Sequence, residues 1–70
     1  MPHIDITMFP GRDDKVKSEL AKKVRLFIAD ELSIDKSVVS VSVKDIEKEK
    51  WMEHIKTFSE DTMYEKPEYK

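Results

Sequence analysis

The chain has 70 residues, no cysteine, a formal net charge of −2 and 40% charged residues. Disulfides and thiolate metal sites are therefore excluded, and the interspersed charges lack the basic stripe typical of nucleic-acid-binding proteins. Two histidines, His3 and His54, are too few for a zinc site unless carboxylates or another subunit contribute. We expect one domain, residues 1–70, and self-association as the remaining source of stability for so small a fold.

No segment predicts a membrane span or a secretory signal. The longest nearly uncharged run, residues 4–11, is broken at Asp5 and is far too short to cross a bilayer. A charged start followed by an apolar core is also missing. We therefore expect a cytoplasmic protein with neither a membrane nor a nucleic acid as its partner.

Residues 2–9 alternate as a strand does. One face holds Ile4, Ile6 and Met8, and the other holds His3, Asp5, Thr7 and Phe9. Pro2 is tolerated in a strand only at the first position, at an edge or at a bulge, because proline has no N–H to donate to a strand ladder. The letters "PGR" at 10–12 predict a turn after the strand.

Residues 13–33 predict a helix, and residues 37–46 predict a second strand. Asp13 is a suitable N-cap, and apolar residues at steps of three and four form one stripe: Val16, Leu20, Val24, Phe27, Ile28 and Leu32. The second strand is rich in β-branched residues. Its two faces hold Val39, Val41 and Val43 on one side and Val38, Ser40, Ser42 and Lys44 on the other.

Residues 47–66 contain a second predicted helix, with Trp51, Ile55 and Phe58 on one stripe and Pro67 ending it. The element order is β-α-β-α, so the two strands should be parallel. The expected fold class is α/β (α+β): a single β-α-β unit with a C-terminal helix. Two such units would dimerise into a four-stranded sheet, because a two-stranded sheet is marginal alone.

Three residues are candidates for chemistry. If Met1 is removed, Pro2 becomes a free secondary amine, and burial would lower its pKa so that it could act as a general base. Arg12 follows the turn beside a helix start and could bind a carboxylate bidentately. Trp51 could wall a pocket against water. Each has a plainer alternative: an incidental proline, an arginine paired with a neighbouring aspartate, and a tryptophan anchoring a core or interface.

The two histidines are weaker candidates. His3 shares a strand face with Asp5, so a histidine–carboxylate pair is possible there. No serine or cysteine stands in a nucleophile motif nearby. We interpret both histidines as structural or solvent-facing.

Together these features resemble the tautomerase superfamily. The resemblance rests on "MPHIDI..FP", the "GR" turn before a helix, the valine-rich second strand, Trp51 and the "KP.Y" tail. It is nearest to the small 4-oxalocrotonate tautomerase subunits, in particular their PptA-like branch. It implies that Pro2 moves the proton, that Arg12 binds a substrate carboxylate and that Trp51 keeps the pocket apolar. Ser40 stands where the family has a second arginine, so it would contact substrate without supplying charge.

The resemblance implies a cofactor-independent keto–enol tautomerase. Its substrate would be a 2-hydroxydienoate or a pyruvate enol, and one carboxylate is easier to accommodate than two because of Ser40. A homo-oligomer is expected, with a dimer favoured by the long final helix and a hexamer possible. The alternative is a non-catalytic binding module that keeps the fold. Ser40 favours that alternative, as does Met1, which while attached makes the Pro2 nitrogen an amide.

Overall fold

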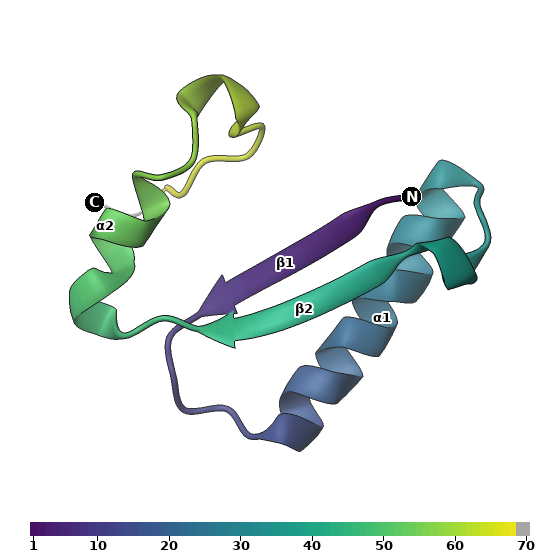
Figure 1. The fold of residues 1–70 in the computed structure, drawn as a ribbon, viewed down its shortest axis with the longest axis horizontal. Coiled ribbons are helices and arrows are strands. Elements are labelled where there is room, and N and C mark those ends of the chain that lie inside the picture. The colour runs from purple at the N-terminus through teal and green to yellow at the C-terminus, as the bar shows by residue number, and fades with distance from the viewer. Residues whose placement is uncertain (69–70) are drawn as a thin grey trace.

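The computed structural model describes residues 1–68 and confirms the β-α-β unit (Figure 1). Its elements are β1 (His3–Met8), α1 (Asp14–Leu32), β2 (Ser40–Asp45) and α2 (Trp51–Ile55), with 3₁₀ turns at Lys36–Val38, Lys48–Lys50 and Glu60–Thr62. The two strands pair in parallel, from His3 opposite Ser40 to Met8 opposite Asp45. The N-terminus therefore lies at one end of the sheet, and α2 lies beyond the other end (Figure 1).

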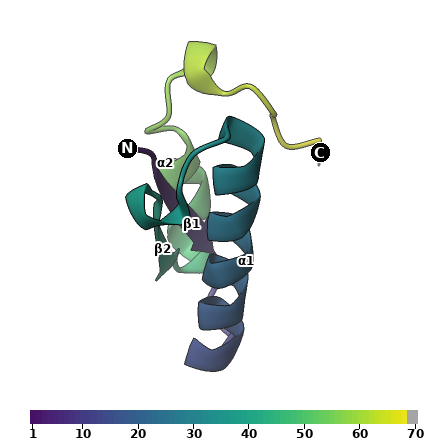
Figure 2. The ribbon, with the colours of Figure 1, turned by 90° about the vertical axis from the view of Figure 1, so that its right-hand side faces the viewer.

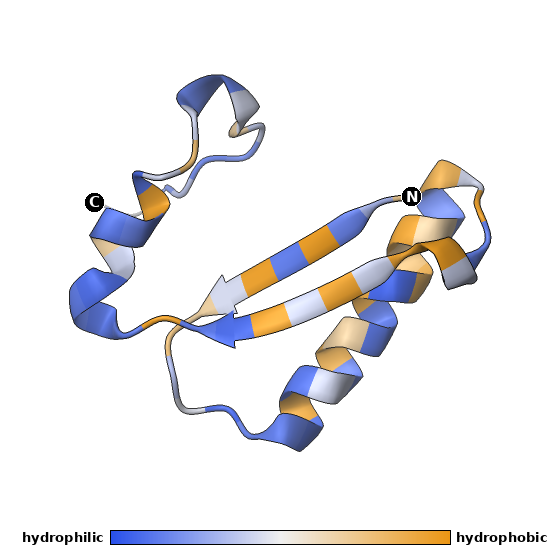
Figure 3. Cartoon of the chain, in the orientation of Figure 1, coloured by the Kyte–Doolittle hydropathy of each residue, from blue (hydrophilic) through white to orange (hydrophobic). Residues whose placement is uncertain are grey.

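The alternation in both strands separates an apolar from a polar face. The register pairs Ile4 with Val41 and Ile6 with Val43, and α1 runs along that face of the sheet (Figure 2). Hydropathy alternates along both arrows (Figure 3) because successive strand residues point to opposite faces. The strand faces expected from the sequence are therefore confirmed.

Both ends of α1 have identifiable caps. The Asp13 carboxylate accepts a hydrogen bond from the Val16 N–H at 3.0 Å, which confirms it as the N-cap. At the other end Ser33 adopts a left-handed conformation, with φ 54°, and its N–H donates to the Asp30 carbonyl at 3.2 Å. A residue in this conformation directs the chain out of the helix, so α1 stops where the sequence indicates.

The final helix is much shorter than the sequence predicts. It ends at Ile55 rather than at Pro67, and the chain continues into the 3₁₀ turn Glu60–Thr62. Side-chain hydroxyls explain the difference, because they bond to nearby backbone and offer an alternative to helix. The Thr57 hydroxyl donates to the His54 carbonyl at 2.6 Å, and the Thr62 hydroxyl donates to the Ser59 carbonyl at 2.8 Å. The argument for a dimer from a long final helix is therefore wrong.

The hydrophobic core of one chain is thin. Within residues 1–68 the buried apolar residues are Ala29 and Val39, whereas Phe27 of the predicted apolar stripe is 63% exposed and Leu32 is 57% exposed. The α1 stripe is thus only partly covered by the sheet. Much apolar surface remains open on an isolated chain.

Within residues 1–68, no helix combines the length and apolar character needed to cross a membrane. Nor do three His, Cys, Asp or Glu side chains in that range gather closely enough to hold a metal ion.

Candidate functional site

Pro2 and Ser40 lie side by side at the N-terminal end of the sheet. The Ser40 N–H donates to the Pro2 carbonyl at 3.2 Å, which extends the strand pairing by one bond beyond β1. Pro2 is partly buried, while Met1 is fully exposed. With Met1 attached, the Pro2 nitrogen is an amide and cannot take a proton. Removal of the exposed Met1 would expose a secondary amine beside Ser40.

A chain of hydrogen bonds follows the polar face next to Pro2. His3 Nδ1 lies 2.7 Å from Ser40 Oγ, and His3 Nε2 lies 3.0 Å from Ser42 Oγ. The Ser42 hydroxyl in turn donates to Asp5 Oδ1 at 2.6 Å. The histidine–carboxylate pair considered possible from the sequence is therefore indirect, because Ser42 of β2 stands between His3 and Asp5.

Arg12 and Trp51 lie at the opposite end of the sheet. Arg12 is exposed in the loop after β1, and Trp51 opens α2 after β2. Within residues 1–68 no hydrogen bond or ion pair holds the Arg12 guanidinium. Its neighbour Asp13 is engaged as the cap of α1. The guanidinium is therefore free to bind an anion.

The length of β1 separates Pro2 from the other candidates. Six strand residues at about 3.3 Å each span about 20 Å. Phe9, which follows β1, contacts Trp51 edge to face with ring centroids 5.2 Å apart. Within one protomer, Pro2 is thus brought together with Ser40 but not with Arg12 or Trp51 (Figure 1).

Trp51 belongs to an aromatic cluster that lines a cavity. The His54 ring lies between the rings of Trp51 and Phe58, with centroids 5.8 and 5.3 Å away. His54 Nε2 is fixed by the Thr7 hydroxyl at 3.0 Å. The cavity, of about 440 Å³, is lined mainly by apolar side chains: Trp51, Ile55, Phe58, Met63 and Pro67, together with Thr7, Glu65 and Lys66. An apolar substrate group would fit there.

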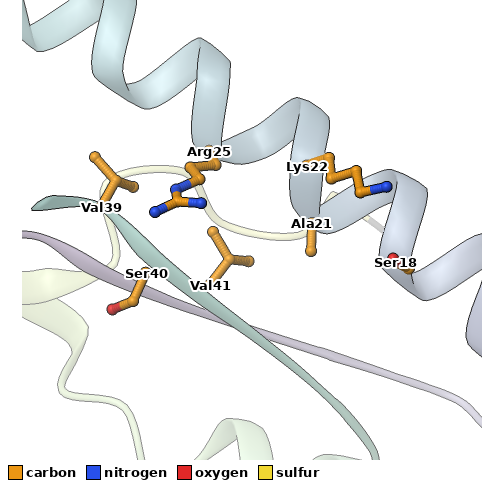
Figure 4. A pocket seen from close by; sticks show the side chains of 7 residues that line it. All are labelled: Ser18, Ala21, Lys22, Arg25, Val39, Ser40 and Val41. Carbon is orange, nitrogen blue, oxygen red and sulfur yellow. The ribbon is translucent and has the colours of Figure 1, made fainter. Parts of the chain in front are cut away.

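A second cavity, of about 320 Å³, lies between α1 and β2 (Figure 4). Lys22 and Arg25 give it a positive wall beside Ser40. The Arg25 Nε–H donates to the Lys36 carbonyl at 2.8 Å, so this side chain holds the turn that leads into β2. The Ser40 hydroxyl points to the other side of β2 (Figure 4). Arg25 therefore does not replace the missing strand arginine on the face where Ser40 meets His3.

Comparison with known proteins decides the family. A family model described as "Tautomerase enzyme" matches residues 2–60. The chain belongs to the tautomerase family. It is also 38% identical over 55 residues to a protein described as "Probable tautomerase" from Xylella fastidiosa (strain 9a5c), a match that covers 79% of this chain and 67% of that relative. The superfamily resemblance and the assignment as an isomerase are confirmed.

The narrower placement in the PptA-like branch of the tautomerase family stays a prediction. Tyr69, the last residue of the "KP.Y" match, lies outside the described residues. Reasoning from the sequence also missed the partners of His3 in this tautomerase. The signal was present in the alternation, since Ser40 and Ser42 share one face of β2. Only the register shows that this is the face of His3 and Asp5.

Proposed function

We propose that the protein is a cytoplasmic, cofactor-independent keto–enol tautomerase that acts on a pyruvate enol or a 2-hydroxydienoate. The mature enzyme uses the Pro2 amine as its base after Met1 is removed. Family membership supports the reaction class. The finer proposal rests on one observation: Pro2 and Arg12 lie at opposite ends of β1. A second subunit can bring its own Arg12 close to Pro2 of the first.

A twofold axis perpendicular to the sheet makes the strands of two copies antiparallel across their junction. The N-terminal end of one β1 then lies beside the C-terminal end of its partner's β1. Pro2 of one protomer would thus approach Phe9 of the partner subunit, and with it the partner's Trp51 and the partner's Arg12. Each complete site would take its base from one chain and its anion-binding and apolar groups from the other.

The distance between neighbouring strands indicates which edge of the sheet pairs with the second subunit. Neighbouring strands lie about 4.8 Å apart, so pairing through β1 leaves one strand spacing between Pro2 and the partner's β1. Pairing through β2 would place two further strands between them, about 14 Å in all. We therefore propose a four-stranded sheet with the two β1 strands at its centre.

The exposed apolar surface supports self-association. Leu26, Phe27 and Leu32 on α1 are each more than half exposed on a single chain. Burying a side chain of this size stabilises a fold by about 1.5–3 kcal/mol. Only two apolar residues are buried within residues 1–68 of a single chain, and a dimer, or a hexamer built from dimers, would cover more of this apolar surface.

The mechanism is a proton shift between two substrate atoms. The neutral Pro2 amine takes the proton from the enol hydroxyl, leaving an enolate, and returns it to carbon, which completes the ketone. Arg12 of the partner subunit holds the substrate carboxylate in a bidentate pair. The apolar wall formed by the partner's Trp51 and the partner's Phe58 disfavours the charged amine and lowers its pKa. Ser40 supplies no charge, so a single carboxylate suits the site better than two.

The test compares wild type with Pro2→Ala after intact mass has shown that Met1 is absent from both. With the enol of phenylpyruvate, kcat should fall by roughly 10²–10⁴-fold in Pro2→Ala, the usual contribution of a general base. Tyr64→Ala is the control, because Tyr64 is 92% exposed and is not part of the proposed site. Equal rates for wild type and Pro2→Ala would overturn the role of Pro2, and a wild-type rate no faster than buffer would leave the non-catalytic binding module as the function.

A further inference from the structure

The directions of the hydrogen bonds on the polar face assign the ring proton of His3. The Ser42 hydroxyl has one hydrogen, and it is donated to Asp5 Oδ1. Ser42 Oγ can therefore only accept from His3 Nε2, 3.0 Å away. Through Ser42, the Asp5 carboxylate thus favours the neutral His3 tautomer that carries its proton on Nε2.

The protonation state of His3 then determines whether the Ser40 hydroxyl donates or accepts a hydrogen bond. When His3 is neutral, its Nδ1 has no proton and accepts the hydrogen of Ser40, 2.7 Å away. Ser40 then presents only lone pairs to a substrate. When His3 carries both ring protons, Nδ1 donates to Ser40 Oγ, and the Ser40 hydrogen is released to donate elsewhere. Histidine is the side chain that ordinarily changes charge between pH 5 and 8.

Ser40 lies beside Pro2 in the sheet, because its backbone N–H donates to the Pro2 carbonyl at 3.2 Å. The enolate oxygen that forms when Pro2 removes the enol proton needs a hydrogen-bond donor, and donors to such oxyanions are among the larger contributions to catalysis. A Ser40 hydroxyl that only accepts would repel that oxygen.

We propose that His3 is a positioning residue that switches Ser40 from acceptor to donor, so that Ser40 stabilises the enolate oxygen when His3 is doubly protonated. This proposal rests on the proposed tautomerase function. It explains how the chain can dispense with an arginine in β2. The other charged or titratable groups toward this face are Asp5 on β1, Lys44 on β2, the amino group at the start of the chain, and His54 of α2, which bonds to Thr7.

The test uses oxalate, whose anionic oxygen mimics the enolate, and oxamate, which has a neutral amide at that position. Binding to processed wild-type protein is measured by NMR at pH 6 and pH 8. The dissociation constant of oxalate should rise roughly tenfold at pH 8, the value of one charge-assisted hydrogen bond, and that of oxamate should change much less. In His3→Asn the dissociation constant of oxalate should be the same at pH 6 and pH 8. Lys44→Gln removes a charge on the same face, outside the chain of hydrogen bonds. In this variant the dissociation constant of oxalate should change between pH 6 and pH 8 as it does in wild type.

Nitrogen NMR of the His3 ring gives a second readout. At pH 8 the proton should reside on Nε2 in wild type, and this preference should weaken in Asp5→Asn. A ring protonated on Nδ1, oxalate binding that does not change with pH, or no oxalate binding overturns the proposal. Failure of the proposed function looks different: phenylpyruvate is not turned over by processed enzyme, while the oxalate and ring measurements still come out as expected.

Discussion

The two ends of the sheet are held by different forces. Hydrogen bonds organise the N-terminal end, where His3 bridges two serines and Arg25 holds the turn before β2. Aromatic contacts organise the C-terminal end, where Phe9, Trp51, His54 and Phe58 follow one another edge to face or tilted. One end holds Pro2, the proposed base, and the other holds the Arg12 guanidinium, unpaired within residues 1–68, and an apolar cavity. Neither end alone has what a proton transfer on an enol acid needs.

The aromatic end should depend most on Trp51. Trp51→Ala removes the edge contact to Phe9 and opens the cavity wall, which should lower the free energy of unfolding by about 2 kcal/mol, less than for a fully buried tryptophan because Trp51 is only partly buried. Urea unfolding at fixed protein concentration measures the loss. Trp51→Phe should recover about half of it. Tyr64→Ala is the control, since Tyr64 is 92% exposed and its removal should change little. An equal loss in the Tyr64 variant would contradict the account.

The hydrogen-bonded end should show a smaller effect that depends on pH. The Ser37 backbone N–H, followed by the Ser37 side chain, holds the pKa of Asp35 below its ordinary value of 3.8. A lowered pKa means that this carboxylate stabilises the fold above its unfolded pKa and loses that contribution as the pH falls through its folded pKa. Asp35→Asn should therefore unfold slightly more easily than wild type at pH 7, and the two should converge in acid. Melting curves between pH 2.5 and 7, on the order of four points, would check this, and a gap that widens in acid would exclude it.

Local patterns predicted the β-α-β unit well. The period-two alternation placed Ile4 and Val41 on the face toward α1, and Asp13 was recognisable as a cap because it precedes the apolar stripe. The final helix was predicted too long. The spacing of apolar residues does not show that hydroxyl groups, such as that of Thr57, bond to the backbone.

The candidate site residues could be proposed one by one from the sequence, but their arrangement could not. Pro2, Arg12 and Trp51 were chosen for their chemistry and Ser40 from the family resemblance. Their placement follows from parallel pairing, which sends the start of β1 and the loop after it to opposite ends. The link from His3 to Asp5 depends on register, which neither strand specifies by itself. A contact between subunits leaves no periodic signal in one chain.

Subunit mixing tests the shared site most directly. Pro2→Ala and Arg12→Ala, each nearly inactive with the enol of phenylpyruvate, are unfolded together, refolded as an equal mixture and assayed. A site shared between two chains restores roughly one quarter of wild-type activity, because half of the dimers are mixed and each mixed dimer has one intact site of two. A site contained within one chain leaves the mixture as inactive as its components, and that result would contradict the account.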